Sequence, residues 1–289
     1  MVTQNWKRIA TRRHGPILRL DDFNHIYLVT LEHGDEVFDA VVKYVPHSTW
    51  SRIEQRNALR YSGLIGPHIH SIKPVPGGIE IIMEAAPFTL ANYRQIALST
   101  SDEQLFVART LTDLLDLLER DDLSHNDLKP QNVLVFPSRD CSIELRLTDF
   151  SYTLSPSRFS RKVQKSERPL GTFGYIPPEF FDEDFYTSDS PYSSLTIKQD
   201  IFSFGMILFY LVCGDLPREE LSLPTPQSDE SRERHKEIMR SRQYRSAVLK
   251  IPILSTPPAF KELVYSCTEP DPLNRPQSFD EIRTLLYSA

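Results

Sequence analysis

Residues 123–136 read LSHNDLKPQNVLVF and place an aspartate, a lysine and an asparagine within six positions: Asp127, Lys129 and Asn132. The stretch follows a helix-like run and precedes an apolar run, so we expect a loop. Asn, Asp and Pro are common in turns, because Asn and Asp bond their own backbone and Pro presets φ. The same side chains could instead accept a proton, neutralise an anion and hold a metal, a set that suits phosphoryl transfer. The rest of the chain must decide between these two interpretations.

The bulk composition is that of a globular protein with a sizeable core. The chain has 289 residues, of which 40% are hydrophobic, enough for one large domain or two lobes that share a cleft. Its formal net charge of -6 argues against a dedicated binder of nucleic acid or of anionic membranes. We therefore expect neither a nucleic acid nor a membrane among its partners.

The cysteines and the apolar runs indicate an intracellular protein. The three cysteines lie far apart without metal-ligand spacing, so we expect reduced thiols, with Cys213 and Cys267 in the core. The N-terminal residues have no apolar signal core, and the longest apolar run, 201–214, is better interpreted as a buried helix than as a membrane span. A cytoplasmic or nuclear location follows as an expectation.

The first 84 residues predict a small sheet with one helix. A helix is expected within 48–64, ended by Gly63, because its apolar residues recur at helical spacing. Short runs rich in β-branched and aromatic residues predict strands at 16–20, 25–32, 36–45 and at two places within 71–86.

The remainder of the chain predicts mostly helices. A helix should begin at Ser101 as N-cap, since acidic residues fill its first turn and apolar residues recur through Leu118. Further elements are expected as a hairpin over 132–150, a buried helix over 200–213 and a final helix ending at 289. The predicted fold class is α+β in a single domain of residues 1–289, with a β-rich lobe at about 1–84, a connector at about 84–87 and a helical lobe at about 88–289.

Six short motifs resemble, in the same order, motifs of the eukaryotic protein kinase family. Six matches in register could hardly arise by chance, whereas any one of them could. The resemblance runs from about Leu18 to the C-terminus and implies a two-lobed kinase-like fold. The motifs are AVVK (40–43), HNDLKPQN (125–132), TDFS (148–151), GTFGYIPPE (171–179), DIFSFGMILFYLVCGDLP (200–217) and DPLNRP (271–276).

The resemblance assigns nucleotide-binding roles in the first lobe. It implies that Lys43 binds the α- and β-phosphates of ATP and that Glu54 pairs with it. Without the other motifs, Lys43 would be interpreted as a strand lysine that keeps its charge in water. Met83 would lie at the back of the nucleotide pocket, and the backbone from Glu84 to Ala86 would contact adenine.

The resemblance also assigns roles in the transfer of the phosphoryl group. It implies that Asp127 orients and deprotonates the incoming hydroxyl, that Lys129 contacts the γ-phosphate, and that Asn132 and Asp149 hold Mg²⁺. In this family, Lys129 and Thr172 indicate that serine or threonine is the acceptor of the phosphoryl group. Structural roles follow for three further residues: Asp200 would anchor the backbone of the catalytic loop, and Glu179 would pair with Arg275.

One segment and three single positions depart from the family pattern. Residues 20–29, where a glycine-rich loop is expected, contain no glycine and include Asp21 and Asp22, so weak ATP binding is expected. Val41 replaces an alanine and would crowd the adenine site. Asn126 replaces an arginine that commonly captures an activation-segment phosphate, so activity should not depend on phosphorylation there. Ser151 replaces a glycine and restricts the backbone, although a residue this small can still be accommodated.

Two functions stay open at this point. The first is ATP-dependent transfer of phosphate to serine or threonine hydroxyls of protein substrates by an atypical kinase, because every side chain with a chemical role is retained. The alternative is a pseudokinase that acts as a binding or scaffold module for a partner protein, favoured by the loop without glycine and by Val41. A third interpretation, a small-molecule phosphotransferase, is disfavoured by Lys129, by GTFGYIPPE and by Asp200.

Overall fold

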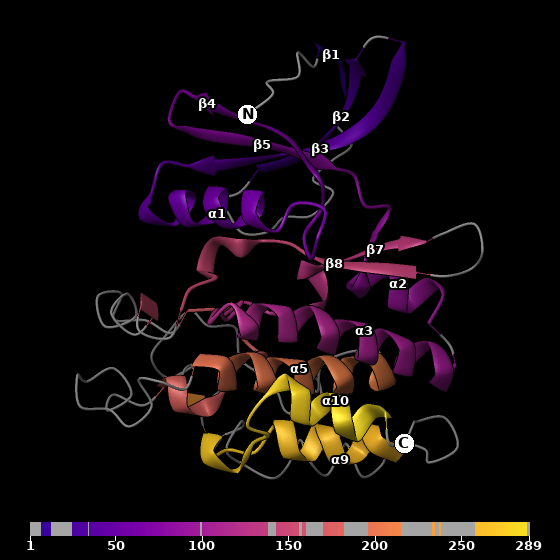
Figure 1. Ribbon diagram of the computed structural model, residues 1–289, viewed down its shortest axis with the longest axis vertical. Coiled ribbons are helices and arrows are strands. Elements are labelled where there is room, and N and C mark those ends of the chain that lie inside the picture. Colours follow the sequence, from indigo (N-terminus) through magenta and orange to yellow (C-terminus); the bar gives the residue numbers. More distant parts are fainter. Residues whose placement is uncertain are drawn as a thin grey trace. The chain divides into compact units, whose positions relative to one another are not determined.

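The computed structural model forms two compact units (Figure 1). The first comprises residues 1–88 and 134–151, and the second comprises residues 89–133 and 152–289. The predicted strand at 16–20, Asp21, Asp22 and Cys141 lie outside the described residues. The structure describes residues 7–12, 25–33, 35–98, 100–137, 143–155, 158–159, 170–181, 196–214, 233–234, 237 and 258–287.

A five-stranded antiparallel sheet dominates the first unit, in the order β1-β2-β3-β5-β4. Strand β1 was not predicted from the sequence. Successive side chains of a strand point to opposite faces, so Ala40 and Val42 belong to one apolar cluster while Val41 packs against another that contains Met83. The strands are β1 (Lys7–Arg12), β2 (His25–His33), β3 (Glu36–Pro46), β4 (Ile69–Val75) and β5 (Gly78–Glu84).

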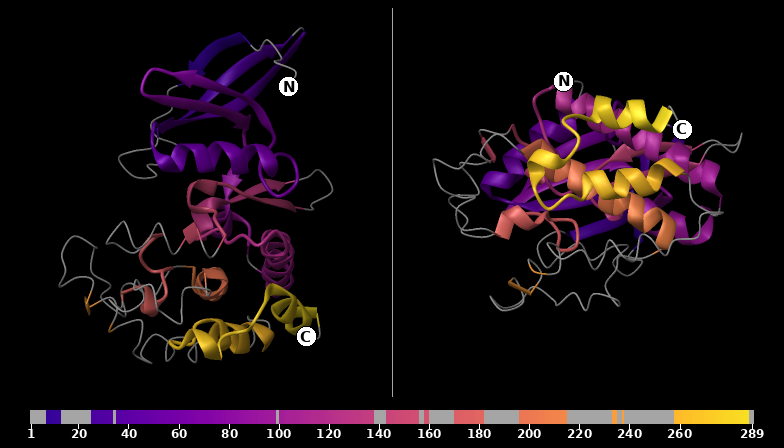
Figure 2. Two further views of the ribbon diagram at one scale, coloured as in Figure 1. Left: turned by 60° about the vertical axis from the view of Figure 1, so that its left-hand side comes forward. Right: turned by 90° about the horizontal axis from the view of Figure 1, so that it is seen from below.

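The helix of the first unit, α1 (Thr49–Arg60), packs against β4 and β5 (Figures 1 and 2). A capping box begins it: the Ser48 hydroxyl accepts from the Ser51 backbone N–H, and the Ser51 hydroxyl accepts from the Ser48 N–H, each at 3.1 Å. The helix ends near Gly63, whose φ of 69° suits a residue without a side chain. This arrangement carries Glu54 to the sheet.

A hairpin of β7 (Val133–Pro137) and β8 (Ile143–Leu147) precedes Asp149. The Leu147 N–H donates to the carbonyl of Ile65 at 2.6 Å and so ties β8 to the segment that follows α1. Gly66 lets the chain approach closely there, since a Cβ would lie 3.0 Å from the Phe150 ring. The short helix η2 (Phe150–Tyr152) follows.

The second unit is mainly helical. Helix α5 contacts α3 and α9, and α10 packs along α3 (Figure 1). The N-cap of α3 is Thr100 rather than the predicted Ser101, because the Thr100 hydroxyl accepts from the Glu103 N–H. The elements after the sheet are β6 (Phe88–Thr89), α2 (Leu90–Ile96), α3 (Ser101–Arg120), η1 (Pro130–Asn132), η3 (Pro178–Phe181), α5 (Thr196–Cys213), α9 (Pro258–Cys267), η6 (Pro272–Asn274) and α10 (Phe279–Tyr287).

The close contact of α5 with α9 depends on Gly205. A Cβ at this position would lie 2.7 Å from the Cβ of Cys267, closer than side chains approach one another. Cys267 is buried, as predicted, and burial raises the pKa of its thiol to about 12. Cys213 is exposed, so its predicted place in the core is wrong: it is the last residue of α5, where the helix leaves the core. None of the helices in the described parts of the chain has the length and apolarity needed to cross a membrane.

Candidate functional site

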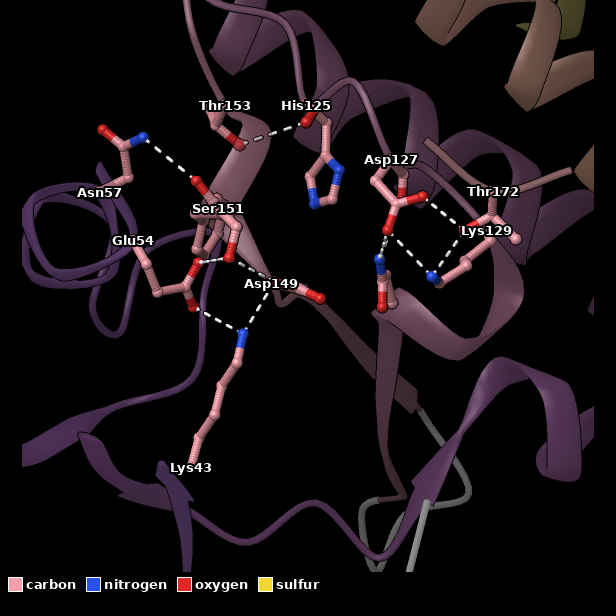
Figure 3. Close-up of polar contacts among 12 residues, drawn as sticks. Lys43, Glu54, Asn57, His125, Asp127, Lys129, Asp149, Ser151, Thr153 and Thr172 are labelled. Carbon is pink, nitrogen blue, oxygen red and sulfur yellow. Dashed lines mark hydrogen bonds and ion pairs between the residues drawn. The ribbon is translucent and has the colours of Figure 1, made fainter. Parts of the chain in front are cut away.

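One group of site residues lies in the first unit, where the ammonium of Lys43 contacts two carboxylates (Figure 3). Its Nζ donates to Glu54 Oε1 at 3.0 Å and to Asp149 Oδ1 at 2.7 Å. The side chains of Lys43 and Glu54 are each only 2% exposed. The predicted pair of Lys43 with Glu54 is therefore present, and Asp149 joins it from the segment after β8.

The buried charges of this cluster shift one another's titration. Burial lowers the pKa of Lys43, but the carboxylates of Asp149 and Glu54 outweigh that effect, and the net shift is upward. Burial raises the pKa of Glu54, and Lys43 only partly offsets this rise. One ammonium facing two carboxylates leaves excess negative charge, which favours a further cation at Asp149.

The backbone of Asp149 is left-handed, with φ of 65°. Aspartate tolerates this region better than most residues, and such conformations are commonly found at functional sites. The hydroxyl of Ser151 contacts Asp149 Oδ1 at 2.9 Å and Glu54 Oε2 at 3.0 Å. Sequence reasoning treated Ser151 only as a restriction on the backbone and missed these contacts.

The residues predicted to line the nucleotide pocket lie at the end of β5 and just beyond it. Met83 is buried in the apolar cluster that Val41 also contacts, and Ala86 is half-buried in the segment after the strand. Glu84 accepts from the guanidinium of Arg146 and, at 3.2 Å, from the N–H of His68. The ion pair with Arg146 was not predicted, because β5 and β8 lie far apart in the sequence.

The loop at 125–132 lies in the second unit, where the carboxylate of Asp127 accepts three hydrogen bonds (Figure 3). Thr172 Oγ1 donates to Asp127 Oδ1 at 2.6 Å, and Lys129 Nζ donates to Oδ2 at 2.9 Å. Lys129 also donates to Thr172 Oγ1 at 2.7 Å. The three side chains thus form a closed network that holds the carboxylate in one orientation.

Asn132 has an amide that suits a metal ligand. Its Nδ2 donates to the Asp127 carbonyl at 2.8 Å and to Asp127 Oδ2 at 3.2 Å, which fixes the orientation of the amide. Its Oδ1 is buried and has no hydrogen-bond partner among the described residues. A buried acceptor without a partner is unfavourable, and an amide oxygen is a ligand that Mg²⁺ accepts. The amide oxygen of Asn132, taken by itself, therefore has the chemistry of a Mg²⁺ ligand.

Asp200 anchors the backbone of the catalytic loop, as predicted. Its carboxylate accepts from the N–H of His125 at 2.6 Å and from the N–H of Asn126 at 2.9 Å. Burial raises the pKa of Asp200 to about 7, although these two hydrogen bonds favour the charged form. Asn126 takes a left-handed backbone with φ of 64°, and its Nδ2 donates to the carbonyls of Ser124 and Tyr152. Hydrogen bonds within the second unit thus hold the loop at Asn126, the position at which many members of the family have an arginine.

Comparison with known proteins identifies the family. The family model of the protein kinase domain matches residues 71–287, well over half of the chain. A probable serine/threonine-protein kinase from Lactococcus lactis is 31% identical over 169 residues, which cover 56% of this chain and 24% of that protein. A receptor-like serine/threonine-protein kinase from Arabidopsis thaliana is 28% identical over 170 residues, covering 56% of this chain and 43% of that protein.

The match to these relatives is partial, since the chain spans less than half of the length of either of them. The match to the family model, in contrast, extends from β4 to the end of α10. It includes the motif HNDLKPQN (125–132) and the four motifs that follow it in the sequence. The α+β architecture, with its antiparallel sheet followed by helices, agrees with that match. The chain belongs to the protein kinase family.

Proposed function

We propose that this protein transfers the γ-phosphoryl group of ATP to serine or threonine hydroxyls of protein substrates. The observation that carries the proposal is the carboxylate of Asp127, which Thr172, Lys129 and Asn132 hold in one orientation. A general base must be positioned before it can act, and rigid positioning supplies much of the rate in phosphoryl transfer. The serine/threonine kinase names of the relatives support the choice of acceptor.

In the proposed reaction, Asp127 takes the proton of the acceptor hydroxyl. The acceptor oxygen forms a bond to the γ-phosphorus as the bond from that phosphorus to the leaving oxygen of ADP breaks. Lys129 offsets negative charge on the transferred group, and Lys43 binds the α- and β-phosphates. Met83 would lie at the back of the nucleotide pocket, and the backbone of Glu84 to Ala86 would bind adenine.

Mg²⁺ would be held by Asn132 Oδ1 and the carboxylate of Asp149. The partnerless amide oxygen of Asn132 and the excess negative charge around Asp149 support this assignment. When bound, the ion neutralises charge on the β- and γ-phosphates.

A binding module without transfer is the second candidate function. Val41 favours it, because this side chain packs on the same face of β3 as Lys43 and contacts the cluster that contains Met83. A valine at this place narrows the space available for adenine compared with the alanine usual in the family. Such a protein would bind nucleotide weakly and would act through a partner protein.

Replacing Lys43 with methionine is expected to lower phosphate transfer at least about 100-fold, as removal of one preorganised charge does in other enzymes. The change also leaves Glu54 and Asp149 without their shared cation. The measurement is transfer of labelled γ-phosphate, with Mg²⁺ and then Mn²⁺, to a generic basic protein and to the chain itself.

The matched control is Lys73→Met, which removes an exposed lysine from β4 of the same sheet. Thermal unfolding of both variants separates loss of chemistry from loss of fold. Equal transfer by Lys43→Met and the wild-type protein would contradict the assigned role of Lys43. A folded wild-type protein that transfers no phosphate above background would favour the binding module.

A further inference from the structure

We propose that Ser151 is a positioning residue for the metal-nucleotide site, and that its hydroxyl fixes the carboxylate of Asp149 against Glu54. This inference rests on the proposed function, since it assigns Asp149 to Mg²⁺. It concerns a residue at which this chain departs from its family, where the motif TDFS (148–151) has serine in place of glycine.

The geometry places one hydroxyl between two carboxylates. Ser151 Oγ lies 3.0 Å from Glu54 Oε2 and 2.9 Å from Asp149 Oδ1 (Figure 3). Glu54 belongs to α1, whereas Asp149 and Ser151 belong to the segment after β8. Glycine has no hydroxyl, so the serine adds a donor that can bond one of these carboxylates while it lies within hydrogen-bond distance of the other.

The link fixes one side of the Asp149 carboxylate. Lys43 and Ser151 both contact the same oxygen, Oδ1, at 2.7 and 2.9 Å. Figure 3 shows the second carboxylate oxygen directed away from both of them. The side chain of Asp149 is 12% exposed, so one face of it is accessible to a ligand. Two contacts on one oxygen therefore orient the other oxygen for an incoming cation.

The backbone shows that Ser151 is accommodated without strain. Asp149, not Ser151, is the residue of this segment with a positive φ. A side chain at position 151 therefore meets no conformational penalty, and the small serine is accommodated.

Replacing Ser151 with alanine is expected to weaken Mg²⁺-dependent nucleotide binding about tenfold. Groups that orient a metal ligand typically contribute 10- to 100-fold to metal affinity, and here Lys43 continues to hold Oδ1. Ser151→Thr keeps the hydroxyl and should stay within about twofold of the wild-type protein. The control variant is Ser71→Ala, which changes a half-buried serine of β4 in the same unit.

The measurement is calorimetric titration of the full chain with ATP at a series of Mg²⁺ concentrations. A transfer assay adds a second readout: in Ser151→Ala the Mg²⁺ concentration for half-maximal rate should rise about tenfold. The rate at saturating Mg²⁺ should stay within about twofold, which distinguishes positioning from a general loss of structure. Unchanged Mg²⁺ dependence in Ser151→Ala, or an equal loss in Ser151→Thr, would overturn the proposal.

Failure of this inference differs from failure of the proposed function. If the wild-type protein transfers phosphate and Ser151→Ala keeps the same Mg²⁺ dependence, the positioning role alone is wrong. If Ser151→Ala weakens Mg²⁺-dependent binding but the wild-type protein transfers nothing, the positioning role holds and the transfer function is wrong. A wild-type protein without Mg²⁺-dependent nucleotide binding contradicts both.

Discussion

Replacing Asp127 with asparagine lowers the rate of phosphate transfer by an expected factor of about 10² to 10⁴, the usual contribution of a general base. The amide cannot accept the proton of the acceptor hydroxyl, so the step that Asp127 is proposed to assist loses its base. The rate of transfer at saturating ATP should fall, while the affinity for ATP should change little, because Asp127 is not among the residues assigned to the nucleotide.

The fold should tolerate this substitution because asparagine has nearly the same shape as aspartate. The remaining carbonyl oxygen of the amide can accept from Lys129 or Asn132, and the Thr172 hydroxyl can rotate to accept from the new NH₂ group. The Asp127 carbonyl continues to accept from Asn132 Nδ2, which keeps the loop closed. A change in thermal unfolding should therefore be small compared with the loss of activity.

The measurement is transfer of labelled γ-phosphate by the variant and the wild-type protein at equal concentration, with unfolding followed in parallel. Asp122→Asn is the matched control, since it makes the same chemical change at an exposed residue just after α3. Asparagine also suits the left-handed backbone of Asp122, with φ of 55°. Transfer that persists in Asp127→Asn would show that another group acts as the base.

Local patterns in the sequence were sufficient to predict most of the elements of the fold. Strands β2, β3, β4 and β5 and helices α1, α3 and α5 follow from alternation and helical spacing of apolar residues. Strand β1 was missed, because KRIATR carries three charged residues in six and, within the described residues, pairs with β2 alone. The misplaced N-cap of α3 reflects two neighbouring residues, Thr100 and Ser101, that both suit the position.

Long-range contacts explain what the sequence could not predict about the site. The pair of Lys43 with Glu54 was predictable only through the family resemblance, since nothing local singles out Glu54. The contacts of Ser151 depend on the attachment of β8 to Ile65, and the ion pair of Arg146 with Glu84 depends on two distant strands. Side-chain geometry of this kind arises from tertiary packing and has no local signal in composition or periodicity.

The pair of Glu179 and Arg275 is the most extensively bonded buried ion pair among the described residues. The guanidinium donates to both carboxylate oxygens of Glu179, at 2.6 and 2.7 Å. Its other donors reach the carbonyls of Glu269, Lys198 and Pro270, so all five N–H groups have acceptors. The side chains of Arg275 and Glu179 are 0% and 5% exposed, so water cannot replace a lost partner.

Replacing Glu179 with glutamine is therefore expected to lower the free energy of unfolding by about 3–5 kcal/mol. The amide keeps the volume of the side chain but removes the charge, which leaves the guanidinium of Arg275 buried without a counter-ion. The NH₂ group of the new glutamine also faces an N–H of Arg275, at a place where a carboxylate oxygen of Glu179 accepted a hydrogen bond. Because α5 and η6 meet at this pair through Lys198 and Arg275, the loss should affect the helical unit as a whole.

Denaturant unfolding of Glu179→Gln, the wild-type protein and the control Glu262→Gln measures this effect. Glu262 is an exposed glutamate of α9, so the same chemical change there should cost less than about 0.5 kcal/mol. The slope of the free energy against denaturant concentration should stay constant, since the change alters stability rather than the surface exposed on unfolding. A loss below about 1 kcal/mol in Glu179→Gln would mean that the four backbone and side-chain acceptors remaining around Arg275 are enough to hold its charge, and that the carboxylate adds little to the stability of this unit.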